Sequence, residues 1–173
     1  MTEVQTCALP ILLYWALGEG ELTGRFPTMG EGLVCGGSAR YQIYRTADDR
    51  YLSVAPIEER FWQVFCEAID LPMPYRNDAS DPKRSKDAIA KQLASMPLAH
   101  WLSRFEGKDV CVQVINTVSE ARQDPHFAAR GLFEHQVATD EGPVSALPVP
   151  IAACFRDAPG IKDYPRRHTE EST

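Results

Sequence analysis

The sequence predicts an α+β fold, in which helices cover a small sheet. Two short runs rich in aromatic and β-branched residues, between residues 39 and 55, are typical of paired strands. After residue 57 the hydrophobic period changes from two residues to about 3.6, which indicates helices. Short strand patterns then alternate with helical ones as far as residue 137, with no internal repeat. A length of 173 residues with 44% hydrophobic and 24% charged positions suits one globular domain, or one domain and a fragment.

The first eleven residues show neither hydrophobic period. Val4 to Ile11 reads like a translated sequencing adapter, and foreign sequence of this kind has to be left out of fold reasoning. We therefore expect residues 1–11 to be non-native, native sequence to begin near Leu12, and the reading frame to be a truncated gene fragment. The alternative is an ordinary coil that leads into a helix.

Residues 12–35 are expected to contain the end of a helix and a loop. The apolar run from Leu12 to Leu17 suits a helix, and Gly18 and Gly20 are expected to stop it. The glycine-rich residues that follow are typical of a loop.

The domain proper is expected over residues 36–139 and begins with a hairpin. Residues 39–44 and 51–55 are its predicted strands, and Asp48 and Asp49 supply the turn chemistry between them. Helices follow over residues 57–69, 82–96 and 98–105. A strand is expected over 110–115, two short helices over 117–123 and 125–130, and another strand over 132–137. Residues 140–173 are expected to be an irregular return segment with a polar tail.

Composition excludes several classes of partner. The formal net charge of −6 and a pI near 5.2, without a clustered basic face, argue against nucleic acid and anionic membranes. No apolar run approaches the roughly 20 residues that a membrane span needs. The five cysteines are widely spaced and lack a Cys-x-x-Cys pair, so neither a disulfide framework nor a metal site is suggested. We expect a cytoplasmic protein without a metal.

Glu58 is the strongest candidate for a catalytic residue. It lies where a predicted strand gives way to a helix, beside Pro56 and Ile57, and a carboxylate at such a junction can face a cleft. The competing interpretation is structural, since acidic residues in a first helical turn complement the helix dipole. Either Glu58 or Glu59 can have that role alone. The sequence shows no serine nucleophile elbow, phosphate-binding loop or dinucleotide fingerprint, and Cys66 and Cys111 suit inert core thiols.

The stretch GGSARYQIYRTADDRYLSVAPIEERFW, from Gly36 to Trp62, closely resembles the class III CoA-transferase family. That family includes formyl-CoA transferase, carnitine CoA-transferase and alpha-methylacyl-CoA racemase. Two later stretches, VCVQVI at residues 110–115 and EARQDPHFAARG at residues 120–131, agree in order and spacing. The resemblance implies a small α+β domain and a return segment, truncated, without the family's N-terminal nucleotide-binding-like domain. It also implies a homodimer of interlocked chains for the full-length parent.

The resemblance further implies acyl-CoA chemistry, with coenzyme A as part of the substrate. In the racemases of this family, a Glu at the position of Glu58 works with a His and an Asp from the N-terminal half to move a proton next to the thioester. In the transferases, an Asp of that half forms a mixed anhydride with the acyl group and then a thioester with CoA, which passes to a carboxylic acid acceptor, and a glycine-rich loop closes over the site. Only Gly36 and Gly37 stand at that loop here, which favours the racemase branch.

Three arginines are candidates for contact with CoA phosphates, namely Arg40, Arg45 and Arg50, although arginines of a hairpin are more often structural or solvated. The chain by itself is expected to be inactive, because the catalytic His and Asp would lie in the other half. A non-catalytic binding module is the remaining alternative.

Overall fold

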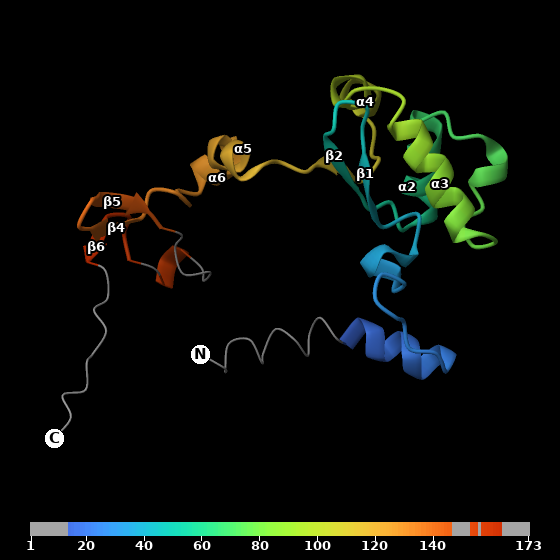
Figure 1. Cartoon of the computed structure of the whole chain (residues 1–173), viewed down its shortest axis with the longest axis horizontal. Coiled ribbons are helices and arrows are strands. Elements are labelled where there is room, and N and C mark those ends of the chain that lie inside the picture. Colours follow the sequence, from blue (N-terminus) through green and yellow to red (C-terminus); the bar gives the residue numbers. More distant parts are fainter. Residues whose placement is uncertain (1–13, 147–152, 156, 164–173) are drawn as a thin grey trace. The chain divides into compact units, whose positions relative to one another are not determined.

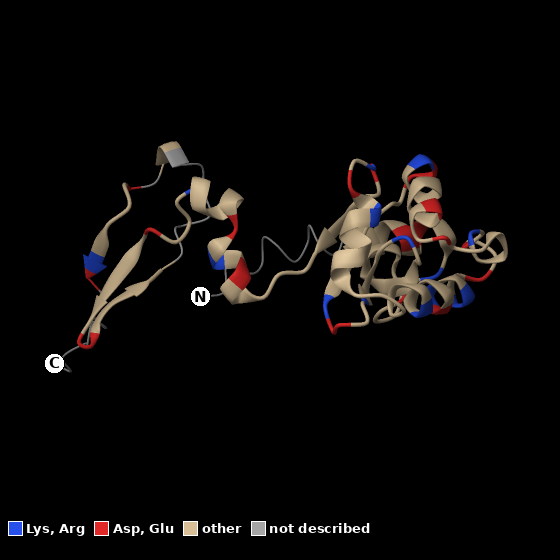
Figure 2. Ribbon diagram, turned by 90° about the horizontal axis from the view of Figure 1, so that it is seen from above, with Lys and Arg blue, Asp and Glu red and all other residues tan. Residues whose placement is uncertain are grey.

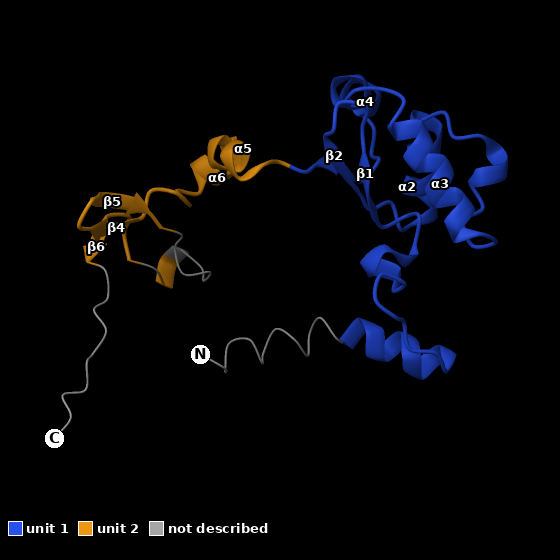
Figure 3. Ribbon diagram, in the orientation of Figure 1, with its two compact units in different colours: residues 1–115 blue, residues 116–173 orange. Residues whose placement is uncertain are grey.

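The computed structural model describes residues 14–146, 153–155 and 157–163 (Figure 1). The chain forms two compact units, residues 1–115 and 116–173 (Figure 3). Each described unit has its own three-stranded sheet. Helices accompany both sheets, so the expected α+β class is confirmed. The units divide at residue 115 and not at residue 139 as expected, because the strand near residue 137 pairs with later strands and not with the first sheet.

Residues 14–23 are helical, and the expected stop at Gly18 and Gly20 is wrong. A glycine inside a helix costs only about 1 kcal/mol, so it weakens a helix without ending it. The helix ends instead at Gly24, which has φ 73° and donates its amide to the Gly20 carbonyl at 2.8 Å. This left-handed glycine after the last turn is a common helix terminus.

The predicted hairpin is confirmed in the first sheet. Strands β1 (Gln42–Arg45) and β2 (Tyr51–Val54) are antiparallel, and β3 (Val112–Val114) pairs antiparallel with β2. Tyr44, Leu52 and Val54 are buried, whereas Ile43 and Tyr51 on the alternate positions are exposed. The period of two residues therefore gives the sheet one core face and one open face.

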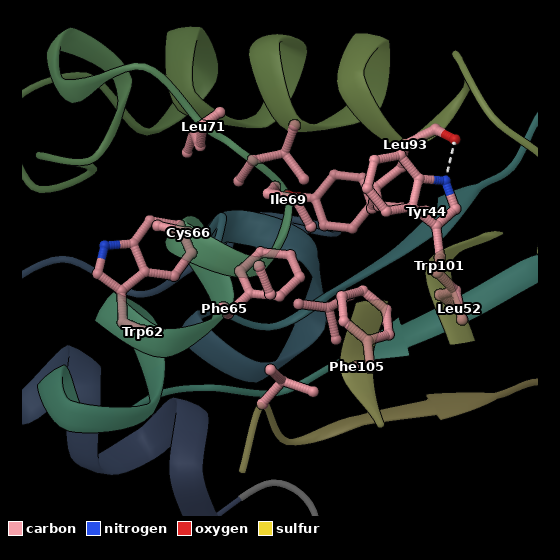
Figure 4. Close-up of a cluster of buried hydrophobic side chains, with 14 of the residues drawn as sticks. Tyr44, Leu52, Trp62, Phe65, Cys66, Ile69, Leu71, Leu93, Trp101 and Phe105 are labelled. Carbon is pink, nitrogen blue, oxygen red and sulfur yellow. Dashed lines mark hydrogen bonds between the residues drawn. The ribbon is translucent and has the colours of Figure 1, made fainter. Parts of the chain in front are cut away.

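Three helices contribute to the core beside this sheet: α2 (Glu59–Ala68), α3 (Pro82–Leu93) and α4 (Leu98–Phe105). A short 3-10 helix, Met73–Tyr75, lies between α2 and α3 in the sequence. Figure 4 shows the aromatic and aliphatic side chains of the three helices meeting those of the sheet in one cluster. The Phe65 ring lies 5.9 Å from the Trp62 ring and 6.3 Å from the Phe105 ring, centroid to centroid. Trp101 satisfies its buried indole N–H by donating to the Leu93 carbonyl at 2.9 Å. These contacts fix α2 and α4 against one core.

The hairpin turn is docked on the connection between α3 and α4. The carboxylate of Asp48 accepts a hydrogen bond from the Leu98 amide at 3.0 Å, at the first residue of α4. Buried Thr46 donates its hydroxyl to the same carboxylate at 2.6 Å, and the Ala47 amide donates to the Met96 carbonyl at 3.0 Å. Asp49 takes a left-handed φ of 58° that completes the turn. The Thr-Ala-Asp-Asp segment thus has a structural task, because it caps a helix 50 residues further along.

Replacing Asp48 with Asn is expected to lower the melting temperature of the chain at pH 7. The hydrogen bond from Thr46, together with that from the Leu98 amide, lowers the pKa of Asp48. When the pKa of a carboxyl group is lower in the folded chain than in the unfolded chain, where it is near 3.9, its ionised form stabilises the fold at pH values above the unfolded-state pKa. This stability is lost as the pH falls through the folded-state pKa. The difference in melting temperature between D48N and the parent chain should therefore disappear at acidic pH. Asp87→Asn, on the exposed side of α3, is the matched control. An equal fall in melting temperature in D87N would contradict the capping role of Asp48. A difference between D48N and the parent that does not depend on pH would contradict it too.

The second unit holds the two short helices that the sequence predicts. They are α5 (Val118–Gln123), which begins with a capping box between Thr117 and Glu120, and α6 (Pro125–Ala129), capped by Asp124. The following strand is β4 (Gln136–Thr139), four residues later than expected at its start.

The region after residue 140 is more regular than expected. Strand β5 (Gly142–Ser145) pairs antiparallel with β4, and β6 (Ile161–Asp163) pairs parallel with β4 on the other side. Gly142 has φ 114°, which the tight β4–β5 turn requires. The two strands are short and exposed and β5 contains a proline, so they lack the alternation that reveals a strand in a sequence. Residues 1–11 and most of the tail lie outside the described residues.

Acidic and basic residues are interspersed along the ribbon of the first unit (Figure 2). None of the described helices is both long and apolar enough to cross a membrane.

Candidate functional site

Glu58 lies at the junction between β2 and α2. The chain leaves β2 through Ala55, whose amide donates to the Cys111 carbonyl at 2.9 Å and so keeps the exit beside the start of β3. Glu58 is the residue before α2 and has an extended backbone, φ −72° and ψ 142°. Its carbonyl accepts hydrogen bonds from the amides of Phe61 at 3.1 Å and Trp62 at 3.0 Å. The first turn of α2 thus fixes the Glu58 backbone, while the side chain is exposed and makes no cap.

The structure separates the two adjacent glutamates that the sequence could not distinguish. Glu59 pairs with Arg40, Oε2 to Nη1 at 2.8 Å, and accepts a hydrogen bond from the Gln63 amide group. The Gln63 bond, and after it the Arg40 bond, lowers the pKa of Glu59. Within the described part of the chain, the Glu58 carboxylate has no hydrogen bond and no ion pair. Glu59 therefore has the structural role, and Glu58 is available for chemistry.

The thiol of Cys111 lies close enough to Glu58 to feel its charge. Burial raises its pKa, and the charges of Asp109 and Glu58 raise it further. Cys111 precedes β3 with a left-handed φ of 50° and is half-buried, so the expectation of a core position inside a strand is wrong. Cys66 does lie in the core, and burial raises its pKa to about 12, which leaves an inert thiol at neutral pH.

The glycine segment forms a short turn, Leu33–Gly37, that contacts β1. A Cβ on Gly37 would come within 1.9 Å of the Glu31 carbonyl oxygen, so only glycine fits there. The Gly36 carbonyl accepts from the Gln42 amide group at 3.1 Å and from Lys86 Nζ at 3.0 Å. Donors from β1 and α3 therefore hold the turn in place.

A cavity of about 320 Å³ lies between this turn and the open face of the sheet. Its lining includes Val34, Cys35 and Gly36 from the turn and Tyr41, Ile43 and Ser53 from the sheet side. Its volume is at the lower end of the range for small-molecule pockets. The apolar side chains at its rim, Tyr41 and Ile43, are exposed in this chain.

Gly37→Ala is expected to displace the turn, because the added methyl group meets backbone and not a movable side chain. The bonds that hold the Gly36 carbonyl would be lost with it. Hydrogen exchange followed by mass spectrometry should then show faster amide exchange in peptides over residues 30–40. Gly18→Ala is the control, since nothing lies within 4 Å of its added carbon and it is helical; it should leave that exchange unchanged. Unaltered exchange in G37A would show that the turn is not held as described.

The three candidate arginines do not converge. Arg40 lies before β1, and its guanidinium is engaged by Asp78, Glu59 and the Ile57 carbonyl. Arg45 and Arg50 flank the turn at the other end of the hairpin, where Arg45 pairs with Asp49. For Arg40 this geometry favours the structural alternative. For Arg45 and Arg50, contact with CoA phosphates stays a prediction. Over the described ranges no group of three His, Cys, Asp or Glu side chains is placed to hold a metal ion.

The profile of the CoA-transferase family III matches residues 4–166, nearly the whole chain. The chain belongs to the CoA-transferase family III. The match begins inside residues 1–11, whose foreign origin stays a prediction.

Two curated relatives in this family are racemases. The chain is 30% identical over 147 residues to the alpha-methylacyl-CoA racemase of Homo sapiens and 28% identical over 147 residues to that of Mus musculus. In both cases the alignment covers 82% of this chain, and the chain spans 38% of the relative's length. The expected resemblance to one portion of this family is therefore confirmed.

Solved structures agree on the fold. The crystal structure of Rv3272 from Mycobacterium tuberculosis, in its orthorhombic form, superposes with a TM-score of 0.54 at 20% identity, over 70% of this chain and 36% of that one. The structure of a point mutant of the same protein superposes with a TM-score of 0.53 at 18% sequence identity, over 74% of this chain and 37% of that one. The small mixed domain of this family is thus the fold of the chain.

Proposed function

We propose that this chain supplies a catalytic carboxylate, Glu58, to an acyl-CoA-processing enzyme of the racemase type. The observation that carries the proposal is the contrast at the start of α2. Glu59 is bound by Arg40 and Gln63, whereas the neighbouring Glu58 is exposed on a fixed backbone with its carboxylate free of described partners. Similarity to two alpha-methylacyl-CoA racemases supports the choice of reaction.

The chemistry requires a group of this kind. The hydrogen on the carbon next to a thioester becomes removable when the resulting enolate oxygen is stabilised, and a positioned carboxylate can take that proton. A second acid on the opposite face returns a proton and inverts the centre. This chain offers one carboxylate, and the partner acid would come from the part of the relatives' length that the chain does not span. The chain alone is accordingly expected to be inactive.

The substrate of the full-length protein would be an acyl-CoA, with coenzyme A as its carrier and no metal. Arg45 and Arg50 at the hairpin turn would be its phosphate contacts from this chain. We also expect the full-length protein to be a cytoplasmic homodimer.

The second candidate function is transfer of CoA between carboxylic acids. The small number of glycines favours the racemase branch, but the position of the Gly36–Gly37 turn beside a cavity supports the transferase, because a glycine turn lets backbone approach a bound ligand closely. This route needs a covalent acyl-aspartyl intermediate on a residue outside the chain.

Hydroxylamine separates the two functions. The full-length protein, in which this chain is joined to the remainder of the family's length, would be incubated with a 2-methylacyl-CoA in the presence and absence of hydroxylamine. An acyl-enzyme anhydride is intercepted as a hydroxamate, whereas proton transfer offers nothing to intercept. We expect epimerised thioester without enzyme-dependent hydroxamate. Hydroxamate formation with CoA release, and no epimerisation, would establish the transferase. Binding of the thioester with neither reaction would point to a non-catalytic module.

A further inference from the structure

We propose that Arg40 is a positioning residue for Glu58, because it binds the backbone carbonyl of Ile57 before that residue and the side-chain carboxylate of Glu59 after it. The inference rests on the proposed function, because it matters only if Glu58 transfers a proton. It gives Arg40 a task other than contact with CoA phosphates.

One edge of the Arg40 guanidinium is anchored to the core. Its Nε lies 3.0 and 3.1 Å from the two carboxylate oxygens of Asp78, and its Nη2 donates to the Asp78 Oδ1 at 2.9 Å. The two side chains are only 18% and 12% exposed, so water competes weakly for these bonds. The guanidinium carbon also lies 4.8 Å from the centre of the buried Trp62 ring. Such a paired and stacked arginine has little freedom to move.

The other edge of the same guanidinium reaches the residues before and after Glu58. The Arg40 Nη1 donates to the Ile57 carbonyl at 3.2 Å and pairs with Glu59 Oε2 at 2.8 Å. Glu58 lies between these two contacts, and its own carbonyl is bound by the first amides of α2. The peptide that carries Glu58 is therefore tied through Arg40 to Asp78, a residue 38 positions from Arg40.

This arrangement suits positioning better than ligand binding. All three guanidinium nitrogens have protein partners, and one of those partners is a nearly buried carboxylate that would repel a phosphate. A misplacement of about 1 Å in a reacting group can cost on the order of 100-fold in rate. Lysine, with a single nitrogen, cannot hold Asp78 on one edge and residues 57 and 59 on the other.

The test compares Arg40→Lys with the parent in the full-length protein, using uptake of solvent deuterium at the α-carbon of a 2-methylacyl-CoA. We expect kcat for exchange to fall at least about tenfold while KM stays within about twofold, because the reacting group moves and the CoA contacts do not. In a Glu58→Gln background the same substitution should have no further effect on the residual rate. Arg84→Lys, an arginine of α3 that lies over the Tyr75 ring, is the matched control and should change neither constant.

A raised KM with unchanged kcat in Arg40→Lys would overturn the positioning role in favour of CoA binding. A further loss in the Glu58→Gln background would overturn it in favour of general stability. If Arg40→Lys does not fold, Glu59→Ala removes one contact of the outer edge and leaves the Asp78 anchor; it should lower kcat roughly threefold to tenfold, and an unchanged kcat would refute the proposal. Absence of exchange in the parent would instead refute the proposed function itself.

Discussion

Replacing Glu58 with Gln in the full-length protein is expected to slow epimerisation of a 2-methylacyl-CoA by about 10²- to 10⁴-fold, the usual effect of losing a general acid or base. Gln keeps the shape and the polarity of the side chain but cannot take up a proton. Because Glu58 is exposed and its side chain makes no helix cap, the free energy of unfolding should hardly change. The loss should appear in kcat, measured from the ratio of the two epimers over time.

The matched control is Glu67→Gln, an exposed glutamate at the other end of the same helix. It removes the same charge from α2 and should leave kcat unchanged. Equal rates for E58Q and E67Q would show that Glu58 only complements the helix dipole, which is the structural alternative that the sequence left open.

Trp62→Ala is expected to lower the free energy of unfolding of the chain by about 3–5 kcal/mol, the cost of removing a large buried aromatic side chain. Trp62 is fully buried, and its indole N–H donates to the Arg76 carbonyl at 2.8 Å. The Arg40 guanidinium lies over its ring. The substitution would leave a cavity, an unpaired carbonyl and an unsupported ion pair. Urea unfolding followed by circular dichroism measures the change.

Two companion variants show where this loss comes from. Trp62→Phe keeps most of the packing and loses the hydrogen bond, so it should cost less than the alanine variant. Trp15→Ala removes a half-exposed tryptophan from the helix at residues 14–23 and should cost no more than about 0.5 kcal/mol. A Trp62→Ala variant as stable as Trp15→Ala would contradict the core described here.

Local patterns predicted most of the first unit. The hairpin and helices α2, α3 and α4 follow from hydrophobic period, and their ends agree within a few residues. The wrong predictions concern features that depend on pairing between distant segments or on a single backbone dihedral angle. Gly24 ends the first helix, and not Gly18, because Gly24 takes the left-handed conformation. Strand β4 joins the second sheet because its partners lie later in the chain, which no local pattern can reveal.

In the candidate site too, local patterns predicted the position of a residue, whereas its role depends on distant contacts. The strand-to-helix junction placed Glu58 from sequence, but its distinction from Glu59 depends on Arg40, 19 residues before Glu59 in the numbering. The role of Arg40 depends in turn on Asp78, and the role of Asp48 on the start of α4. Each of these polar pairs joins segments far apart in the chain, and residue type alone gave no signal of the partner.

Solvent-deuterium exchange in the unsubstituted full-length protein tests the proposed proton transfer most directly. A single 2-methylacyl-CoA epimer would be incubated in D2O, and the product analysed by mass spectrometry and by NMR of the α-position. Racemase-type chemistry predicts one deuterium at the α-carbon, appearing together with the other epimer, and loss of both when Glu58 is replaced by Gln. An α-position that keeps its hydrogen while CoA passes to a carboxylic acid would contradict the assignment of Glu58 as a proton carrier.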